Sequence, residues 1–157
     1  MENHEEFMRE AIALSKQNVE KGLGGPFGAV IVKDGKIVAK SANTVTTTND
    51  PTAHAEVATI RLACKELNTF TLEGCVIYTS CEPCPMCLGA IYWARLDKMY
   101  YGNTKTDAAV IGFDDAFIYE ELDLKPEDRK LKAEQLLNNE ALEAFKMWDI
   151  AEGRVDY

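Results

Sequence analysis

The stretch Cys81-Glu82-Pro83-Cys84-Pro85-Met86-Cys87, taken with His54-Ala55-Glu56 upstream, indicates both the fold and the chemistry of this chain. An imidazole and two thiolates three residues apart supply the ligand types and spacing that hold zinc. Three protein ligands leave the fourth tetrahedral position open, where a bound water can have a pKa near ~7. We therefore expect one catalytic zinc ion here, with Glu56 beside it as the acid/base group.

Both halves of this motif are expected at helix starts. His54 and Glu56 are too close in sequence to share a helix face, but at a helix N-terminus both side chains can reach one point. Cys84 and Cys87 lie three apart on one face near the start of a later helix, where the helix dipole favours thiolates. The predicted zinc ligands are therefore His54, Cys84 and Cys87.

Cys81 leaves a second arrangement open. With His54, Cys84 and Cys87 it could form a closed Cys₃His site that has no room for water, and the protein would then be a non-catalytic zinc module. The catalytic arrangement is favoured because Pro83-Cys84 marks the helix start and Cys81 precedes it.

Length, charge and cysteine content narrow the class of protein. A chain of 157 residues fits one domain, which we expect to span residues 1–157. The net charge of -9 makes nucleic acid an unfavourable partner. No apolar run approaches the ~20 residues of a membrane helix, and no signal peptide is visible at the N-terminus. Five cysteines without a secretion signal fit a reducing compartment, so we expect a cytoplasmic protein with no membrane partner.

The rest of the chain predicts an α/β fold with a mixed sheet of about five strands and helices on both faces. A first helix is expected over residues 5–20, and Asp50 is expected to cap the helix that carries His54. The helix from about Pro83 to Ala94 is apolar nearly all round, which predicts a central, buried position. The stretches with strand patterns are Gly28–Val32, Lys36–Lys40, Cys75–Thr79 and Lys98–Gly102.

The chain resembles the cytidine-deaminase-like superfamily, and within it is similar to the bacterial guanine deaminases. The pattern H-x-E followed by P-C-x-x-C is the signature of zinc nucleobase deaminases. Bacterial tRNA adenosine deaminases share the segments Gly25–Val30 and Asn49–Glu56, so those segments indicate the superfamily and not the substrate. Phe113-Asp114-Asp115 and the terminal Tyr157 favour guanine.

This resemblance implies a three-layer cytidine-deaminase-like fold and hydrolytic deamination of guanine to xanthine and ammonia. It implies zinc at His54, Cys84 and Cys87, a proton shuttle at Glu56, and a further catalytic role for Asp115. The residues expected to contact the base are Phe27, Asn43, Ala55, Trp93, Asp115 and Tyr157.

The residues themselves leave blander interpretations open. Asn43 is as readily a turn residue. From the residues alone, Phe27 and Trp93 are better explained as core, and Asp114 and Asp115 are helix caps by default. A tRNA adenosine deaminase, or a deaminase of cytosine or another small amino-heterocycle, also stays open.

The resemblance further implies a homodimer. In the bacterial guanine deaminases the C-terminal tail, here about residues 148–157, crosses to a neighbouring subunit, where its final tyrosine closes the pocket.

Overall fold

A computed structural model describes residues 3–157, which fall into two compact units. The first unit ends at Ala116 and the second spans Phe117–Tyr157. The division comes at the start of the acidic C-terminal region, and the single domain over residues 1–157 stays a prediction.

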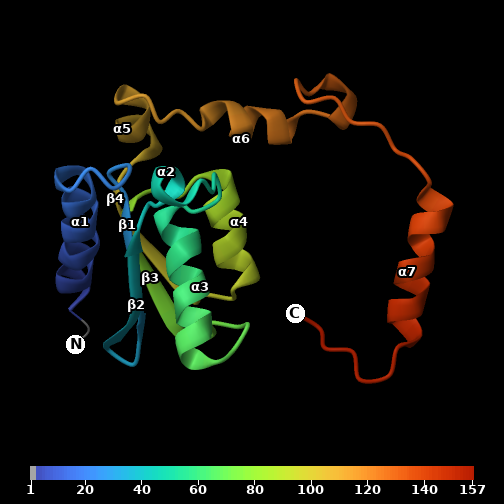
Figure 1. Cartoon of the computed structure of the whole chain (residues 1–157), viewed down its shortest axis with the longest axis horizontal. Helices are drawn as coiled ribbons and strands as arrows, with labels where there is room; N and C mark the ends of the chain where they lie inside the picture. Colours follow the sequence, from blue (N-terminus) through green and yellow to red (C-terminus); the bar gives the residue numbers. More distant parts are fainter. Residues whose placement is uncertain (1–2) are drawn as a thin grey trace. The chain divides into compact units, whose positions relative to one another are not determined.

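The first unit is built on a four-stranded mixed sheet of order β2-β1-β3-β4 (Figure 1). β1 pairs antiparallel with β2 and with β3, while β3 and β4 run parallel. The strands are β1 (Gly28–Lys33), β2 (Lys36–Ala42), β3 (Cys75–Cys81) and β4 (Lys98–Asn103).

All four stretches with strand patterns therefore form strands, but the expected number of about five is wrong. After β4, Thr104 closes a capping box with Asp107 and begins α5 (Lys105–Val110). From there to Tyr157 the described elements are helical, so no further segment pairs with the free edge of β4.

The turn between β1 and β2 has the geometry that its sequence predicts. Asp34 and Gly35 both have positive φ, at 50° and 71°. Two such residues match the right-handed twist of the flanking strands, as Asp-Gly turns commonly do. This hairpin places β1 inside the sheet, between β2 and β3.

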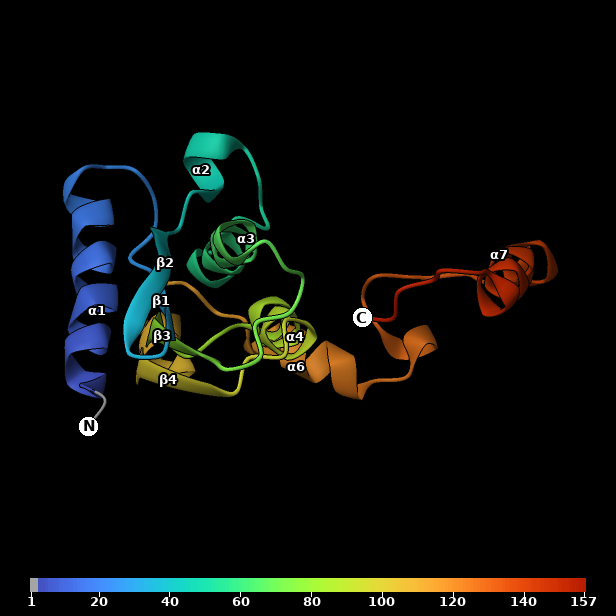
Figure 2. The same ribbon diagram turned by 90° about the horizontal axis from the view of Figure 1, so that it is seen from below.

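Helices cover both faces of the sheet and make the three expected layers (Figure 2). α1 (His4–Glu20) packs on one face, where Val30, Val32 and Tyr78 meet Ala11 in a buried cluster. α3 (Ala55–Leu67) and α4 (Pro85–Trp93) lie on the other face. The core on that side has Ile31, Ala63, Leu72, Ile77 and Ile91 among its buried members.

α3 begins later than expected, because Asp50 is not its cap. The Asp50 carboxylate accepts hydrogen bonds from the backbone N–H and hydroxyl of Thr52, at 2.8 and 2.7 Å, and so closes a turn ahead of the helix. His54 is the N-cap residue of α3. The four-residue helix α2 (Val45–Thr48) lies in the connection that precedes this turn.

The predicted central, buried position of α4 is found for only one side of the helix in this unit. Cys87 and Ile91 are buried, but Met86, Tyr92 and Trp93 are exposed, the last two by 72% and 63%. Apolar composition does not distinguish contact within one subunit from contact with another molecule.

The second unit has no buried residue. α6 begins at Ala116 and runs to Asp123, and is followed by η1 (Pro126–Asp128) and α7 (Asn138–Ile150). Large apolar side chains, including Leu131, Phe145 and Ile150, are exposed along it. Within residues 3–157 no helix is both long and apolar enough to cross a membrane.

Candidate functional site

Three side chains that could hold a metal ion meet where two helices of the first unit begin. His54 is the N-cap of α3, Cys84 is the N-cap of α4, and Cys87 lies in the first turn of α4. His54 Nδ1 lies 3.5 Å from the Sγ of Cys84 and 3.5 Å from the Sγ of Cys87. All three ligand atoms lie within 4.8 Å of one another.

These separations fit a tetrahedral zinc ion. Zn–S bonds of about 2.3 Å and a Zn–N bond of about 2.05 Å, at tetrahedral angles, place nitrogen and sulfur about 3.6 Å apart. The observed 3.5 Å from His54 Nδ1 to each sulfur is close to this value. The chemistry of this donor set, one imidazole and two thiols, also suits zinc.

The two sulfurs differ in proton affinity. The pKa of Cys84 is lowered to about 4, chiefly because the Cys87 thiol donates a hydrogen bond to it and secondarily because His54 does. The pKa of Cys87 is raised, first by the neighbouring Cys84 sulfur and then by burial. Thiolates are the form in which cysteines bind a metal, so the lowered pKa of Cys84 favours cation binding here.

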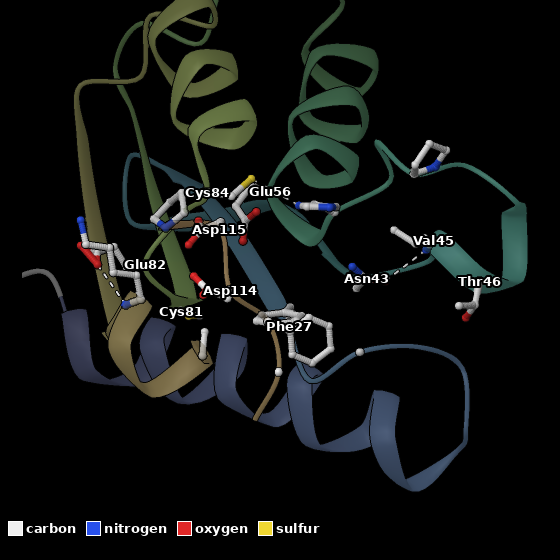
Figure 3. Close-up of a pocket in the computed structure, with 18 residues that line it drawn as sticks. Phe27, Asn43, Val45, Thr46, Glu56, Cys81, Glu82, Cys84, Asp114 and Asp115 are labelled. Carbon is white, nitrogen blue, oxygen red and sulfur yellow. Dashed lines mark hydrogen bonds between the residues drawn. The ribbon is translucent and has the colours of Figure 1, made fainter. Parts of the chain in front are cut away.

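Glu56 is the second residue of α3 and is only 5% exposed. Burial in low-dielectric surroundings disfavours the carboxylate and raises its pKa. Figure 3 shows Glu56, Cys84 and Asp115 pointing into the same cavity. A carboxyl group in this position can exchange protons with a ligand in the cavity.

The cavity has a volume of about 480 Å³, within the usual range for small-molecule sites. It is formed entirely within the first unit. Of the predicted zinc ligands, catalytic residues and base contacts, those that line it are Phe27, Asn43, His54, Glu56, Cys84 and Asp115. Cys81 and Asp114 line it as well. Segments far apart in sequence are thus brought to one small volume.

The remaining expected base contacts do not line the cavity. Ala55 is fully buried at the first position of α3. Trp93 is the last residue of α4, where the Arg95 guanidinium lies 5.7 Å from its ring centroid. Tyr157 belongs to the second unit and is 76% exposed. Contact of these three residues with a substrate stays a prediction.

Several residues of the cavity had no role assigned from the sequence. Phe113 meets Phe27 edge-on, with ring centroids 4.9 Å apart at 89°. Glu82 and Lys105 both line the cavity, and the Glu82 carboxylate accepts a 3.0 Å hydrogen bond from the Lys105 backbone N–H. Phe113 belongs to the Phe113-Asp114-Asp115 motif and Glu82 to the Cys81–Cys87 motif. Their positions in these motifs were the signal in the sequence that could have indicated a place in the cavity.

Asp114 and Asp115 are neighbours in sequence but differ in their surroundings. Asp114 accepts a 2.9 Å hydrogen bond from the Ala116 backbone N–H, which closes a turn just ahead of α6. Asp115 is half-buried, and burial raises the pKa of its carboxyl group. Both aspartates line the cavity, and a catalytic role for Asp115 stays a prediction.

Cys81 stands apart from the metal-binding cluster. Its Sγ donates to the Thr104 carbonyl oxygen at 3.7 Å, and burial raises the pKa of this thiol to about 11. In the described part of the chain, the cluster contains His54, Cys84 and Cys87 only. Cys81 therefore does not join the other three residues in a closed four-ligand arrangement.

Comparison with known proteins places this site in a family. Residues 1–103 match the cytidine and deoxycytidylate deaminase zinc-binding region. The guanine deaminase of Bacillus subtilis is 56% identical over 146 residues, covering 93% of this chain and 94% of that protein. The X-ray structure of that guanine deaminase superposes with a TM-score of 0.96 at 54% identity, covering 99% of each chain. A tRNA-specific adenosine deaminase of Aquifex aeolicus is 45% identical over 97 residues, 62% of this chain and 64% of that protein.

Proposed function

Because the chain belongs to the cytidine and deoxycytidylate deaminase family, we propose that it is a zinc-dependent hydrolase converting guanine and water to xanthine and ammonia. The observation that carries this proposal is the buried Glu56 carboxyl group beside the cluster of His54, Cys84 and Cys87 in one small cavity. Hydrolytic deamination needs this combination of a proton carrier and a Lewis acid.

The zinc-binding residues in this proposal are His54, Cys84 and Cys87, and Cys81 is excluded. When bound, zinc supplies the Lewis acidity that lowers the pKa of the attacking water and stabilises negative charge on its oxygen. Two thiolates nearly neutralise the dication, which helps the product to leave. The thiolate character of Cys84, whose pKa is about 4, favours retention of the metal at neutral pH.

Glu56 carries the protons. Its carboxylate accepts one proton from water as the oxygen attacks the carbon that bears the amino group, and delivers it to the adjacent ring nitrogen. The remaining hydroxyl proton must then reach the amino nitrogen, so that the C–N bond breaks and ammonia leaves. Asp115, whose carboxyl pKa is raised by burial, is our candidate for assisting this second transfer.

The base is held by Phe27 and Asn43. Phe27 offers an aromatic surface that Phe113 supports edge-on. Asn43 Oδ1 accepts a 3.1 Å hydrogen bond from the Val45 backbone N–H, which orients the amide so that Nδ2 can donate to an acceptor on the base. Ala55 and Trp93 remain proposed contacts.

A free base suits this cavity better than tRNA. Its lining includes the acidic residues Glu82, Asp114 and Asp115 with the single cation Lys105, and the whole chain has a net charge of -9. Phosphate-rich ligands are disfavoured by such a field. Likeness to the guanine deaminase also extends past residue 103, whereas the tRNA-specific enzyme matches only 62% of the chain.

We further propose a cytoplasmic homodimer in which the tail over residues 148–157 contacts a neighbouring subunit and Tyr157 closes its cavity. Support comes from the apolar side chains that are exposed in the second unit and on α4. Exposed apolar surface of this kind marks sites of contact with another protein molecule. For the cytoplasm, the support is the odd count of five cysteines, which fits a metal and a reducing compartment better than a disulfide framework. Sedimentation equilibrium tests the dimer, and a monomer at assay concentrations refutes it.

The decisive experiment offers the zinc-loaded protein guanine, adenine, cytosine, their nucleosides and tRNA in parallel and measures ammonia and the deaminated product. Guanine is expected to be turned over with the highest kcat/KM, and the Glu56→Gln variant controls for contaminating deaminases. Ammonia from tRNA or cytosine but not from guanine would overturn the proposal.

A further inference from the structure

Asn18, on α1, is a buried amide with two hydrogen bonds that join separate loops. Its side chain is 4% exposed, and a buried amide costs stability unless its donors are paired. Nδ2 donates to the carbonyl oxygens of Gly25 and Asn43, both at 2.8 Å. Both N–H groups are thus used, and because both partners are acceptors, only the nitrogen end of the amide fits here.

The two carbonyls belong to the segments that carry Phe27 and Asn43. These segments also bond to each other, since the Asn43 backbone N–H donates to the Phe27 carbonyl oxygen at 3.1 Å. The backbone carbonyl of Asn18 itself accepts from Leu23 N–H at 2.9 Å, where the first segment begins. One residue therefore ties two walls of the cavity to α1.

Gly24, Asn18 and the Asn43 carbonyl group are closely packed where the two segments meet α1. A Cβ added at Gly24 would lie 2.5 Å from the Asn43 carbonyl oxygen and 3.0 Å from Asn18 Nδ2. Contacts under 3.0 Å with backbone require a shift, so even a methyl group would push the two segments apart. The spacing between the Phe27 and Asn43 segments is consequently set at this junction.

We propose that Asn18 is a positioning residue for the base: it holds the Phe27 ring and the Asn43 amide at the separation that the base requires. Asn18 does not line the cavity, so it acts only through these two residues. The inference rests on the proposed function, because it takes Phe27 and Asn43 as base contacts. Displacement of binding groups by about 1 Å can cost on the order of 10²-fold in rate.

Two variants test this role from opposite sides of the junction. Asn18→Asp keeps the shape but removes the donors and sets an oxygen against two carbonyl oxygens. Gly24→Ala keeps Asn18 but adds a methyl group that clashes with the Asn43 carbonyl oxygen, so the two segments must move apart. Ser15→Ala is the matched control on α1, since it removes a 2.7 Å hydrogen bond to the Ile12 carbonyl that touches neither segment.

The readouts are zinc content, kcat and KM for guanine, and amide hydrogen exchange at Asn43, whose N–H bonds to Phe27. We expect both variants to bind one zinc ion per chain. Their KM for guanine should rise by about tenfold or more, with a smaller fall in kcat. The Asn43 backbone amide hydrogen should exchange faster than in the parent. The control should match the parent in all of these. A general loss of stability would instead lower the melting temperature without changing KM.

Zinc-loaded, folded Asn18→Asp and Gly24→Ala proteins with parental KM and parental exchange at Asn43 would overturn the inference. A parent protein that turns over no guanine would refute the proposed function instead. The exchange measurement then decides the positioning role without reference to activity, because it reports the Asn43 to Phe27 hydrogen bond directly.

Discussion

Replacing Glu56 by glutamine should abolish most of the activity without costing stability. Glutamine has nearly the same shape as glutamate but cannot accept and return a proton. General acid–base catalysis contributes about 10²–10⁴-fold, which is about 2.7–5.5 kcal/mol of transition-state stabilisation at 1.36 kcal/mol for each tenfold. We expect kcat to fall by this factor and zinc content to stay at one per chain.

The sign of the stability change follows from the environment of Glu56. Burial raises the pKa of its carboxyl group, so the folded protein binds this proton more tightly than the unfolded chain does. Stability contributed by the protonated form is therefore lost as pH rises from the unfolded pKa through the folded one. Glutamine stays neutral, so the variant does not lose this stability as pH rises. After zinc has been removed from both proteins with a chelator, the urea midpoint of the variant at pH 7 should equal or exceed that of the parent.

The assay compares kcat for guanine, bound zinc and urea midpoints for the parent, Glu56→Gln and Glu82→Gln. Glu82 is the matched control, because it is another carboxylate of the cavity and glutamine there retains an acceptor for the Lys105 N–H. The control should keep kcat within about tenfold of the parent. A Glu56→Gln enzyme within the same tenfold would refute the assignment of Glu56 as proton carrier.

Three further outcomes are expected. Cys81→Ser should keep zinc and activity, whereas Cys84→Ser should lose zinc by elemental analysis; zinc loss in the Cys81 variant would restore the closed four-ligand site. Gly28→Ala should cost about 1–3 kcal/mol in urea unfolding, because its Cβ would lie 2.4 Å from the Ala11 carbonyl oxygen. Gly89→Ala, with nothing within 4 Å, should not destabilise α4, and equal losses at both glycines would contradict this reasoning. Deleting Gly153–Tyr157 should sharply reduce deamination at unchanged zinc content, and full activity would show that Tyr157 takes no part.

The sequence by itself determined those features that depend only on residues close together along the chain. The four strands, the Asp34-Gly35 turn and the zinc-binding character of the family follow from local patterns that the structure and the comparisons bear out. Cys84 could be placed at a helix start because a first-turn proline is read from the neighbouring residues. His54 also lies at a helix start, although Asp50, the cap expected for that helix, does not cap it.

Tertiary structure decided which of these local elements meet and which surfaces are covered. Asp50 bonds to Thr52 instead of capping α3, α4 has an exposed face that ends at Trp93, and no segment supplies a fifth strand. The junction at Asn18 was invisible in the sequence, because its partners lie seven and 25 residues away and are backbone carbonyls. Every residue has such a carbonyl, so only the folded backbone could show that these two carbonyls face one buried amide.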